Sequence, residues 1–219
     1  MGKTAWVAGA TGVVGNHLIE LLNQNPVYSE VVALVRTPLP ERWKNLSKVT
    51  QWAVNYQALK TTSTNIHVDD LFCALGSTTK KTPDKKEYYQ IDVQYPLNFA
   101  ALGTQNGASY YGLVSSHGAN PKALSYYLKM KGELEQKLSK YVYPHTSIAR
   151  PSLLKGQRDE FRLLEHLSGF FMDKMPGNYK AIHPIDVAAA LIETANNGNS
   201  GIEFLPSKSM QSASKRYCV

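Results

Sequence analysis

The stretch "VAGATGVVG", from Val7 to Gly15, decides the fold. It places Gly9, Gly12 and Gly15 between an apolar run and an amphipathic segment, in the spacing GxxGxxG. Glycine at these positions lets the chain turn tightly and lets backbone N–H groups approach a pyrophosphate, which the positive end of the following helix also attracts. A glycine trio is a weak signal by itself. Its position between a chain-initial strand and a helix predicts a dinucleotide-binding loop.

Beyond this loop, short apolar runs rich in β-branched residues alternate with longer helical patterns, which is typical of βαβ units around a parallel sheet. The expected strands cover residues 4–9, 30–36, 49–55, 70–76, 109–116 and 145–150. The expected helices cover residues 13–23, 56–61, 87–105, 123–139 and 186–196. Six strands, each followed by a crossover, predict an α/β fold with a doubly wound Rossmann parallel sheet.

The chain of 219 residues is expected to form one continuous domain. Residues 1–150 would form the NAD(P)-binding core. Residues 151–219 would complete the sheet and cover the substrate site as a small C-terminal cap. In this last third, residues 160–172 have a helical pattern, and residues 201–206 form a short apolar run.

Composition excludes several classes of protein. Hydrophobic residues at 43% and charged residues at 19% describe an ordinary globular chain. No apolar run approaches the roughly 20 residues that span a bilayer, and the N-terminus lacks a secretory signal pattern. We therefore expect a cytoplasmic location and no membrane partner. Cys73 and Cys218 have no metal-like spacing, so no metal site is expected, and Cys73 is predicted to be a small core residue.

The formal charge of +7 could indicate a nucleic-acid partner. The basic residues are dispersed, however, and the clusters at residues 80–86 and 207–216 do not interleave aromatic residues along one element. No nucleic-acid partner is expected. A basic field also suits a phosphorylated cofactor or an acidic substrate.

The end of the second expected strand indicates which cofactor is bound. An acidic residue about 20 positions after the glycine loop usually binds the ribose 2′-hydroxyl of NAD. Arg36 occupies that position here, followed by Thr37. A guanidinium can hold a 2′-phosphate by charge-assisted hydrogen bonds, so NADP is favoured over NAD. Alternatively, Arg36 is a solvated strand-end cation and the cofactor is NAD.

The segment "YYLKMKGELE", from Tyr126 to Glu135, contains a candidate proton-transfer pair. Tyr127 and Lys131 are one helical turn apart and project from the same face. An ammonium group near a phenol favours the phenolate, so such a tyrosine can exchange a proton with a carbonyl or alcohol oxygen. The pattern YxxxK is weak by itself, and a solvated helix face is the alternative.

Two further strand ends would border the same crevice, because the carboxyl ends of parallel strands meet at one edge of a sheet. Ser115 and Ser116 end the fifth expected strand, and a hydroxyl there could orient a substrate carbonyl. They could equally be turn formers. Gly76 ends the fourth strand, where it would let the backbone pass close to the cofactor or would simply close a turn.

These motifs together resemble an atypical short-chain dehydrogenase/reductase, and in particular the family of HIV Tat-interacting protein oxidoreductases with its small bacterial homologues, which are epimerase/dehydratase-like. The resemblance runs from the glycine loop through "FCALGSTTKK", "LVSSHGAN", "YLKMKGELE" and "ARPSLLKGQR" to "HPIDVAAAL". It implies that Tyr127 is the catalytic tyrosine, that Lys131 is its partner and that Ser115 or, preferably, Ser116 is the serine.

The resemblance also implies a set of cofactor contacts. They are Thr11, Gly12, Val13, Val14, Arg36, Thr37, Leu75, Gly76, Lys131, Leu154 and either Arg158 or Arg162. Many relatives carry an Asp after the third strand that contacts the adenine, and Asn55 stands there instead. His183 is expected to cap or pack, and Asp186 to be the N-cap of the last long helix.

The resulting hypothesis is an NADP(H)-dependent oxidoreductase that acts on a small carbonyl or alcohol, as a monomer or homodimer. A regulator that senses NADP(H) without turnover is the alternative, because fold alone does not fix function. A sugar-nucleotide epimerase ranks lowest, because the chain after residue 150 is short for a nucleotide-sugar lobe.

Overall fold

The fold comes from a computed structural model that describes residues 2–39, 41–62, 66–155, 180–197 and 200–217. The strands are β1 (Lys3–Ala8), β2 (Tyr28–Val35), β3 (Val49–Ala53), β4 (Asp70–Cys73), β5 (Tyr110–Val114), β6 (His145–Arg150) and β7 (Gly201–Pro206). The helices are α1 (Val13–Gln24), α2 (Lys85–Tyr89), α3 (Tyr95–Gln105), α4 (Tyr126–Leu138), α5 (Pro184–Asn197), α6 (Ser207–Met210) and α7 (Ala213–Tyr217). Two short turns, the 3₁₀ turn η1 (Leu59–Thr61) and the π-helical turn η2 (Gln90–Gln94), complete the set.

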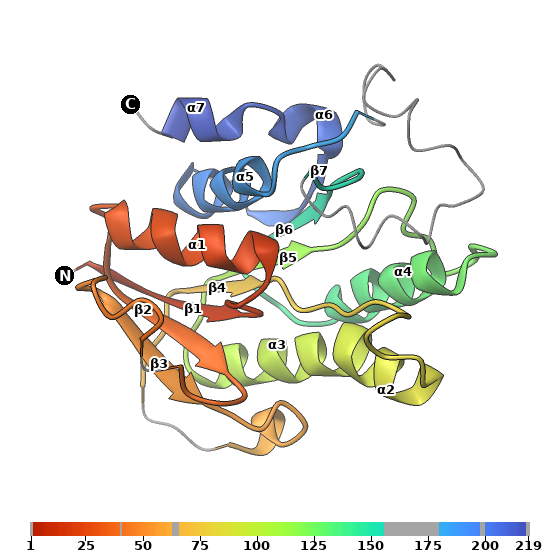
Figure 1. The fold of residues 1–219 in the computed structure, drawn as a ribbon, viewed down its shortest axis with the longest axis horizontal. Coiled ribbons are helices and arrows are strands. Elements are labelled where there is room, and N and C mark those ends of the chain that lie inside the picture. Colours follow the sequence, from red (N-terminus) through yellow and green to blue (C-terminus); the bar gives the residue numbers. More distant parts are fainter. Residues whose placement is uncertain (1, 40, 63–65, 156–179, 198–199, 218–219) are drawn as a thin grey trace.

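The strands form one seven-stranded sheet in the order β3-β2-β1-β4-β5-β6-β7, and every pair is parallel. The strand order reverses direction at β1, so a crevice opens between the carboxyl ends of β1 and β4. The predicted doubly wound Rossmann sheet is confirmed (Figure 1). β7 is the edge strand beside β6, where its register pairs Gly201 with His145.

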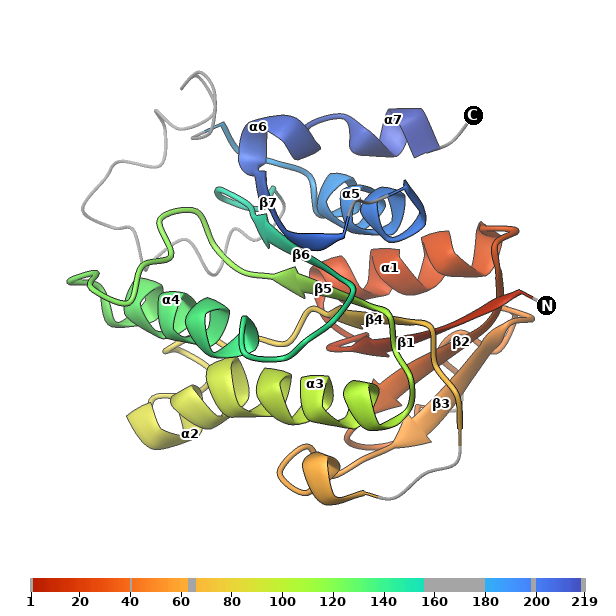
Figure 2. The same ribbon diagram turned by 180° about the vertical axis from the view of Figure 1, so that it is seen from behind.

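Helices cover both faces of the sheet (Figures 1 and 2). α1 and α5 lie on one face, with α7 packed on α5, while α3 and α4 lie on the other. The central strands are apolar at consecutive positions because both faces are buried. In β4, all four residues are buried, as are the last four of β1. Two apolar cores result, one on each side of the sheet.

The predicted helix over residues 87–105 is a single helical rod with an irregular centre. It begins earlier, at Lys85, and Asp84 caps it by accepting a hydrogen bond from the Glu87 N–H. The turn η2 then inserts a π-helical stretch before α3. Such single π turns occur often at functional sites.

The predicted N-cap role of Asp186 is wrong. α5 begins two residues earlier, at Pro184, a residue that is favoured in the first turn because it lacks an N–H. Asp186 instead accepts hydrogen bonds from the backbone N–H and the hydroxyl of Ser214, at 3.1 Å and 2.6 Å. Its carboxylate thus ties the start of α5 to α7. The helical pattern over residues 160–172 lies outside the described residues.

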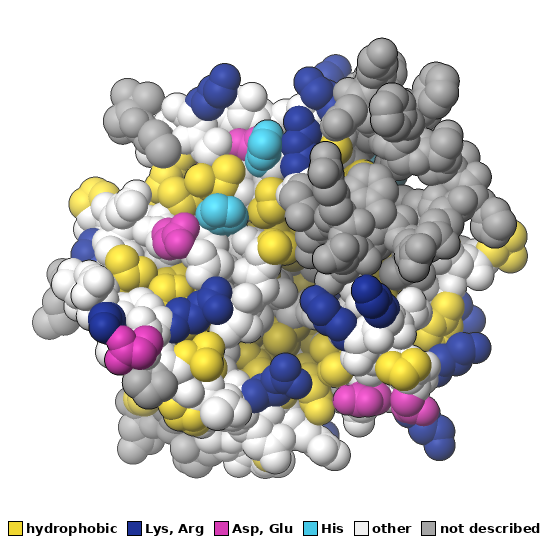
Figure 3. Space-filling model, viewed as in Figure 1, with side chains coloured by type: hydrophobic (Ala, Val, Ile, Leu, Met, Phe, Trp, Pro, Cys, Tyr) yellow, Lys and Arg dark blue, Asp and Glu magenta, His cyan; other side chains and the backbone are white. Residues whose placement is uncertain are grey.

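The surface of the described residues carries basic side chains in several separate places. In the space-filling view, Lys and Arg groups are spread over this face rather than gathered along one element (Figure 3). This distribution agrees with the dispersed basic residues of the sequence.

Candidate active site

The glycine loop after β1 is shaped by two positions where no larger residue fits. Gly9 has φ +78°, and a Cβ there would lie 2.4 Å from the carbonyl oxygen of Ala74. A Cβ at Gly15 would lie 2.0 Å from the Gly9 oxygen. Gly9 therefore lets β1 pass against the segment after β4, and Gly15 lets α1 start directly on the loop. Both contacts require glycine at these positions.

The first turn of α1 presents free N–H groups at the crevice. Gly12 is the N-cap and supplies no side-chain cap, and the first turn contains no acidic residue. The opening N–H groups of a helix have no partner within the helix, and the helix dipole makes this end positive. Thr11, Gly12 and Val13 are exposed, whereas Val14 is buried. The loop is suited to an anionic group such as a pyrophosphate.

The end of β2 contributes two exposed residues, Arg36 and Thr37. A second guanidinium, which the sequence analysis missed, lies in the loop that follows. Arg42 donates to Asn16 Oδ1 at 2.9 Å and stacks over the ring of Trp43 at 5.0 Å. This contact places Arg42 against the first turns of α1. Only the tertiary fold brings it there, because the loop has no periodic pattern.

The segment after β4 runs past the lysine of the candidate pair. A Cβ at Gly76 would lie 3.4 Å from Asp92 Oδ1 and 3.7 Å from Lys131 Nζ. The next residue, Ser77, donates its backbone N–H to Asp92 Oδ2 at 2.7 Å. Leu75 is half-buried beside it. The predicted cofactor segment and the predicted catalytic lysine are thus neighbours.

Lys131 is buried inside the crevice wall, not solvated. Its Nζ lies 3.0 Å from Asp92 Oδ1, and its side chain is 4% exposed. The ammonium also lies 5.9 Å from the centre of the Tyr127 ring. Burial by itself would lower the pKa of Lys131, but the nearby Asp92 carboxylate and the Tyr127 oxygen oppose this and leave the pKa raised. Lys131 therefore stays cationic at neutral pH.

The rest of α4 distinguishes the tyrosines and lysines of "YYLKMKGELE". Tyr127 is half-buried and packs against the core on this side of the sheet. Tyr126 is 38% exposed and donates its hydroxyl to the Lys85 carbonyl at 3.1 Å. Lys129 is exposed. The geometry brings Tyr127 and Lys131 together, and it assigns a different partner to Tyr126.

The two strand-end serines have different surroundings. Ser115 is buried and donates its hydroxyl to Glu135 Oε1 at 2.5 Å. Glu135 is itself held by Arg150, whose Nε and terminal nitrogen lie 3.1 Å and 2.6 Å from the two carboxylate oxygens. Ser116 is half-buried and bonds only locally among the described residues, to the His117 carbonyl at 3.2 Å. Ser116 is the serine whose hydroxyl can turn to a ligand.

Some of the remaining candidate residues are placed by the structure, and others lie outside the described residues. Leu154 forms an isolated parallel bridge with Ile182, which anchors the chain before α5. Asn55 accepts a hydrogen bond from the Gln57 N–H at 3.0 Å, and His183 is exposed. Arg158 and Arg162 lie outside the described residues. Within the ranges that the structure describes, no three His, Cys, Asp or Glu residues are grouped to hold a metal.

This arrangement can bind a phosphorylated ligand at the start of α1 and can move a proton at Tyr127. Two buried carboxylates contact the predicted site residues: Asp92 contacts Lys131 of α4, and Glu135 of α4 accepts a hydrogen bond from Ser115 after β5. Neither was found from the sequence. Glu135 lies one turn beyond Lys131, which was a usable signal, whereas the position of Asp92 depends on the π turn.

The chain was compared with known families and proteins. The model of the NAD dependent epimerase/dehydratase family matches residues 5–146. Protein HTATIP2 of Rattus norvegicus is 28% identical over 214 residues, which cover 95% of this chain and 88% of the relative. Protein FMP52 of Candida glabrata, named mitochondrial, is 32% identical over 171 residues, covering 78% of this chain and 70% of the relative.

Solved structures share the fold. An oxidoreductase of the short chain dehydrogenase/reductase family from Burkholderia thailandensis has a TM-score of 0.69 at 14% identity, covering 96% of this chain and 93% of that one. MoeE5 in complex with UDP-glucose and NAD has a TM-score of 0.68 at 21% identity, covering 92% of this chain and 75% of that one.

The expected cytoplasmic location is wrong in the light of these relatives, because the FMP52 proteins of several fungi are named mitochondrial. The lack of a membrane-spanning run and of a secretory pattern, from which this location was expected, does not distinguish compartments inside the cell. Within the described ranges, no helix is long and apolar enough to cross a membrane.

Proposed function

The chain belongs to the NAD-dependent epimerase/dehydratase family, and from this premise we propose that it is an NADP(H)-dependent oxidoreductase acting on a small carbonyl or alcohol. The observation that carries the proposal is the buried Lys131 ammonium, 3.0 Å from Asp92 and 5.9 Å from the Tyr127 ring, beside the segment after β4. A solvated helix face would not need a buried lysine in this position.

The residues present fit a dinucleotide. The uncapped first turn of α1 would hold the pyrophosphate through its N–H groups, and Gly9 and Gly15 keep the loop free of side chains there. Arg36 and Thr37 would hold the 2′-phosphate, with Arg42 as a second cation nearby. When bound, the nicotinamide supplies or accepts the hydride.

Tyr127 then handles the proton at the substrate oxygen. It gives this proton to the oxygen of a carbonyl undergoing reduction and takes it from an alcohol undergoing oxidation. Lys131, held cationic, favours the phenolate form of Tyr127. The Ser116 hydroxyl would orient the substrate oxygen, since the Ser115 hydroxyl is committed to Glu135.

Replacement of Tyr127 by Phe tests the proposal. The change removes the hydroxyl but keeps the ring that packs against the core, so the fold and the cofactor affinity should change little. Loss of general acid–base catalysis should lower turnover about 10²- to 10⁴-fold. Turnover of small aldehydes, ketones and quinones would be followed by NADPH absorbance, and cofactor affinity by fluorescence titration.

Tyr126→Phe is the matched control, because it removes a hydroxyl one residue away that contacts only Lys85 among the described residues. It should leave turnover within a factor of two or so of the wild-type value. If Tyr127→Phe keeps full activity, the acid is misassigned. If the wild type binds NADPH tightly and turns over none of the substrates, the alternative of a cofactor-sensing regulator is supported.

A further inference from the structure

The proposed chemistry does not use an open groove on the outer surface, which we call the α2 groove. It runs along the rod that α2 and η2 form and reaches the first residue of α4, on the right-hand side of Figure 1. Its volume is about 410 Å³. None of its lining side chains was a predicted catalytic or cofactor residue. The lining residues are Lys85, Lys86, Tyr89, Gln90, Gln94 and Tyr126.

Two lysines give the α2 groove its charge. Lys85 and Lys86 are exposed, and neither forms an ion pair with another described residue. The nearby acids Asp84, Glu87 and Glu133 do not line the groove. Asp84 caps α2, and Glu133 already accepts a hydrogen bond from a tyrosine hydroxyl at 3.0 Å. Among the described residues, the groove therefore carries positive charge that no lining acid balances.

Tyr126 forms one side of the α2 groove, and contacts with α2 hold it in place. Its hydroxyl donates to the Lys85 carbonyl at 3.1 Å, and Lys85 Nζ lies 5.6 Å from the centre of its ring. The ring also packs against Tyr88, with 6.4 Å between the ring centres. Because this aromatic surface is already ordered, a ligand that packs on it pays less conformational entropy.

Two side-chain amides line the part of the groove that η2 forms. Gln94 donates to Asn98 Oδ1 at 2.9 Å. Gln90 is half-buried, and its side chain makes no hydrogen bond to another described residue. A side-chain amide has donors and an acceptor, so it can bind the C=O and N–H groups of a peptide unit. The Gln90 amide is thus available to a ligand that lies in the groove.

From these groups we propose that the α2 groove is a docking site for an extended acidic segment of a partner protein. Carboxylates of the segment pair with Lys85 and Lys86, its main chain bonds to Gln90, and an apolar side chain packs on Tyr126. Charge complementarity carries the choice of partner, because a cationic surface attracts and orients an anionic one. The inference goes beyond the proposed function and does not depend on it.

A second copy of this chain suits the groove less well than an acidic segment. In a two-fold symmetric dimer both subunits use the same patch, so the lysine pair of one copy would lie close to the lysine pair of the other. Like charges placed across an interface destabilise it. The formal charge of +7 on the whole chain adds to this repulsion.

Fluorescence anisotropy with a labelled peptide tests the proposal on the full-length protein. The probe is a short peptide of alternating Glu and Gly residues with a central Leu, and its counterpart carries Gln in place of every Glu. We expect the acidic peptide to bind at least about 10-fold more tightly than its counterpart, and its affinity to fall as salt is added. Equal affinities for the two peptides, or no binding of either, would overturn the proposal.

The double variant Lys85→Glu, Lys86→Glu reverses the charge of the groove and should weaken binding of the acidic peptide at least about 10-fold. Its matched control is Lys60→Glu, Lys140→Glu, which changes the net charge equally at two exposed lysines outside the groove. The control should lose about threefold at most, because salt screens distant charges. Equal losses in the two double variants would show attraction by net charge alone and would contradict the proposal.

Gln90→Ala distinguishes docking in the groove from attraction to a basic surface. It keeps every charge and removes an amide that bonds to no other described residue, so the fold should persist, as circular dichroism would check. Binding of the acidic peptide should weaken about 2- to 10-fold, as expected for one lost hydrogen bond. An unchanged affinity would rule out the groove as the docking site, whatever the lysine variants do.

Two further measurements address other occupants of the groove. A wild type that sediments as a dimer, and as a monomer after Lys85→Glu, Lys86→Glu, would assign the groove to a second copy. Binding to vesicles of anionic lipid that this variant loses, without binding to the peptide, would assign it to a membrane. Either result overturns the proposal. None of these tests contains cofactor or substrate, so they and the turnover test of Tyr127 fail independently.

Discussion

Ser115 and Ser116 show how two identical neighbouring residues acquire different roles. Both follow the end of β5, but only the Ser115 hydroxyl meets the buried Glu135 carboxylate. The sequence left both as candidates because the partner of Ser115 comes from a helix 20 residues away, and the partner of that carboxylate, Arg150, from the next strand. Packing, not residue type, distinguishes the two serines.

Arg36 is the residue on which, in our proposal, the preference for NADP over NAD depends. Its guanidinium is exposed at the end of β2, where a 2′-phosphate would lie. In Arg36→Ala, NADP affinity should fall about 10- to 100-fold, as expected for loss of a charge-assisted hydrogen bond worth about 1.5–3 kcal/mol. NAD affinity should change little. Fluorescence titration with both dinucleotides measures the two values.

Lys44→Ala is the matched control for this change, because Lys44 is a nearby exposed cation that pairs with Glu41. It should leave the ratio of NADP to NAD affinity unchanged. If Arg36→Ala lowers the affinities for NADP and NAD equally, the guanidinium does not bind the 2′-phosphate.

At the scale of elements, the strands could be predicted from the sequence, but the irregular helical turn and the contacts between elements could not. Consecutive apolar residues marked β1, β2 and β4, because strands covered on both faces cannot alternate. The π turn η2 could not be predicted, since an extra residue in a helical turn leaves no periodic trace. The roles of Asp92 and Asp186 followed from helix geometry and tertiary contacts and were therefore missed or misassigned.

The junction of β1 and α1 makes a second test possible. In Gly15→Ala, alanine should favour the helix by about 1 kcal/mol. However, its Cβ would lie 2.0 Å from the Gly9 oxygen, so backbone must move. Overpacking of this kind costs about 1–3 kcal/mol and here involves the cofactor loop. We expect a net loss of unfolding free energy, measured by urea denaturation, together with weaker dinucleotide binding.

Gly76→Ala provides the comparison for this element. A Cβ at Gly76 meets its nearest atom at 3.4 Å, an ordinary contact, and the residue is exposed. Its unfolding free energy should stay within about 0.5 kcal/mol of the wild type. A Gly15→Ala protein as stable as Gly76→Ala would show that α1 can shift away from the loop without cost.

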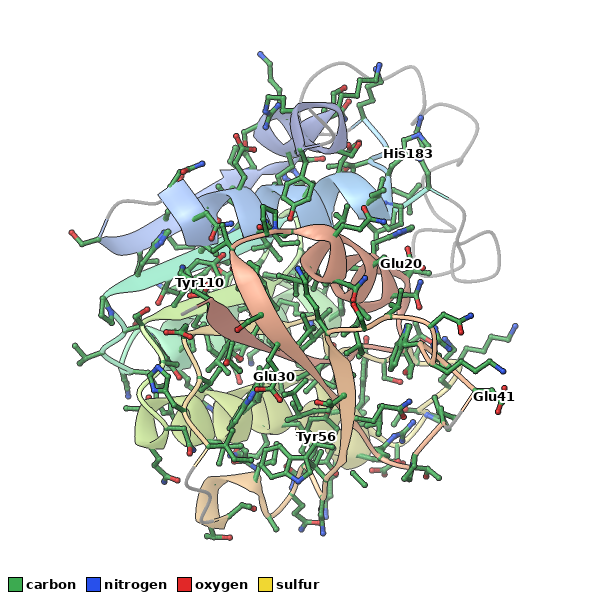
Figure 4. All side chains as sticks on the ribbon, turned by 90° about the vertical axis from the view of Figure 1, so that its left-hand side faces the viewer. Glu20, Glu30, Glu41, Tyr56, Tyr110 and His183 are labelled. Carbon is green, nitrogen blue, oxygen red and sulfur yellow. The ribbon has the colours of Figure 1, made fainter. Side chains whose placement is uncertain are left out.

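At the scale of the whole molecule, a buried carboxyl group connects several elements at the amino edge of the sheet, where the strands begin. Asp70 accepts hydrogen bonds from Tyr28 at 2.6 Å and from Lys3 at 2.9 Å. Lys3 also donates to the Ala195 carbonyl in the last turn of α5, so the start of β1 is tied to the end of α5. Figure 4 views the molecule from this edge, with Tyr110 at the start of β5. This network lies at the opposite edge from the candidate active site.

The pH dependence of stability tests this network. Burial raises the pKa of Asp70, and the hydrogen bonds from Tyr28 and Lys3 only partly oppose it. Because the folded state then binds this proton more tightly than the unfolded chain, Asp70 favours folding most at pH below its ordinary pKa of about 3.9. This contribution is lost as pH rises through the raised pKa. Asp70→Asn removes it, so the stability of the wild type relative to the variant should fall as pH rises.

Urea denaturation of both proteins across the acid to neutral range measures this difference. Glu41→Gln is the control, because the Glu41 side chain is 82% exposed and projects from the edge of the molecule (Figure 4). Its stability relative to the wild type should vary little with pH. If the stability of the wild type relative to Asp70→Asn rises with pH instead, the hydrogen bonds from Lys3 and Tyr28 outweigh the effect of burial on Asp70. Lys3 and Asp70 would then form an ion pair that stabilises the fold at neutral pH.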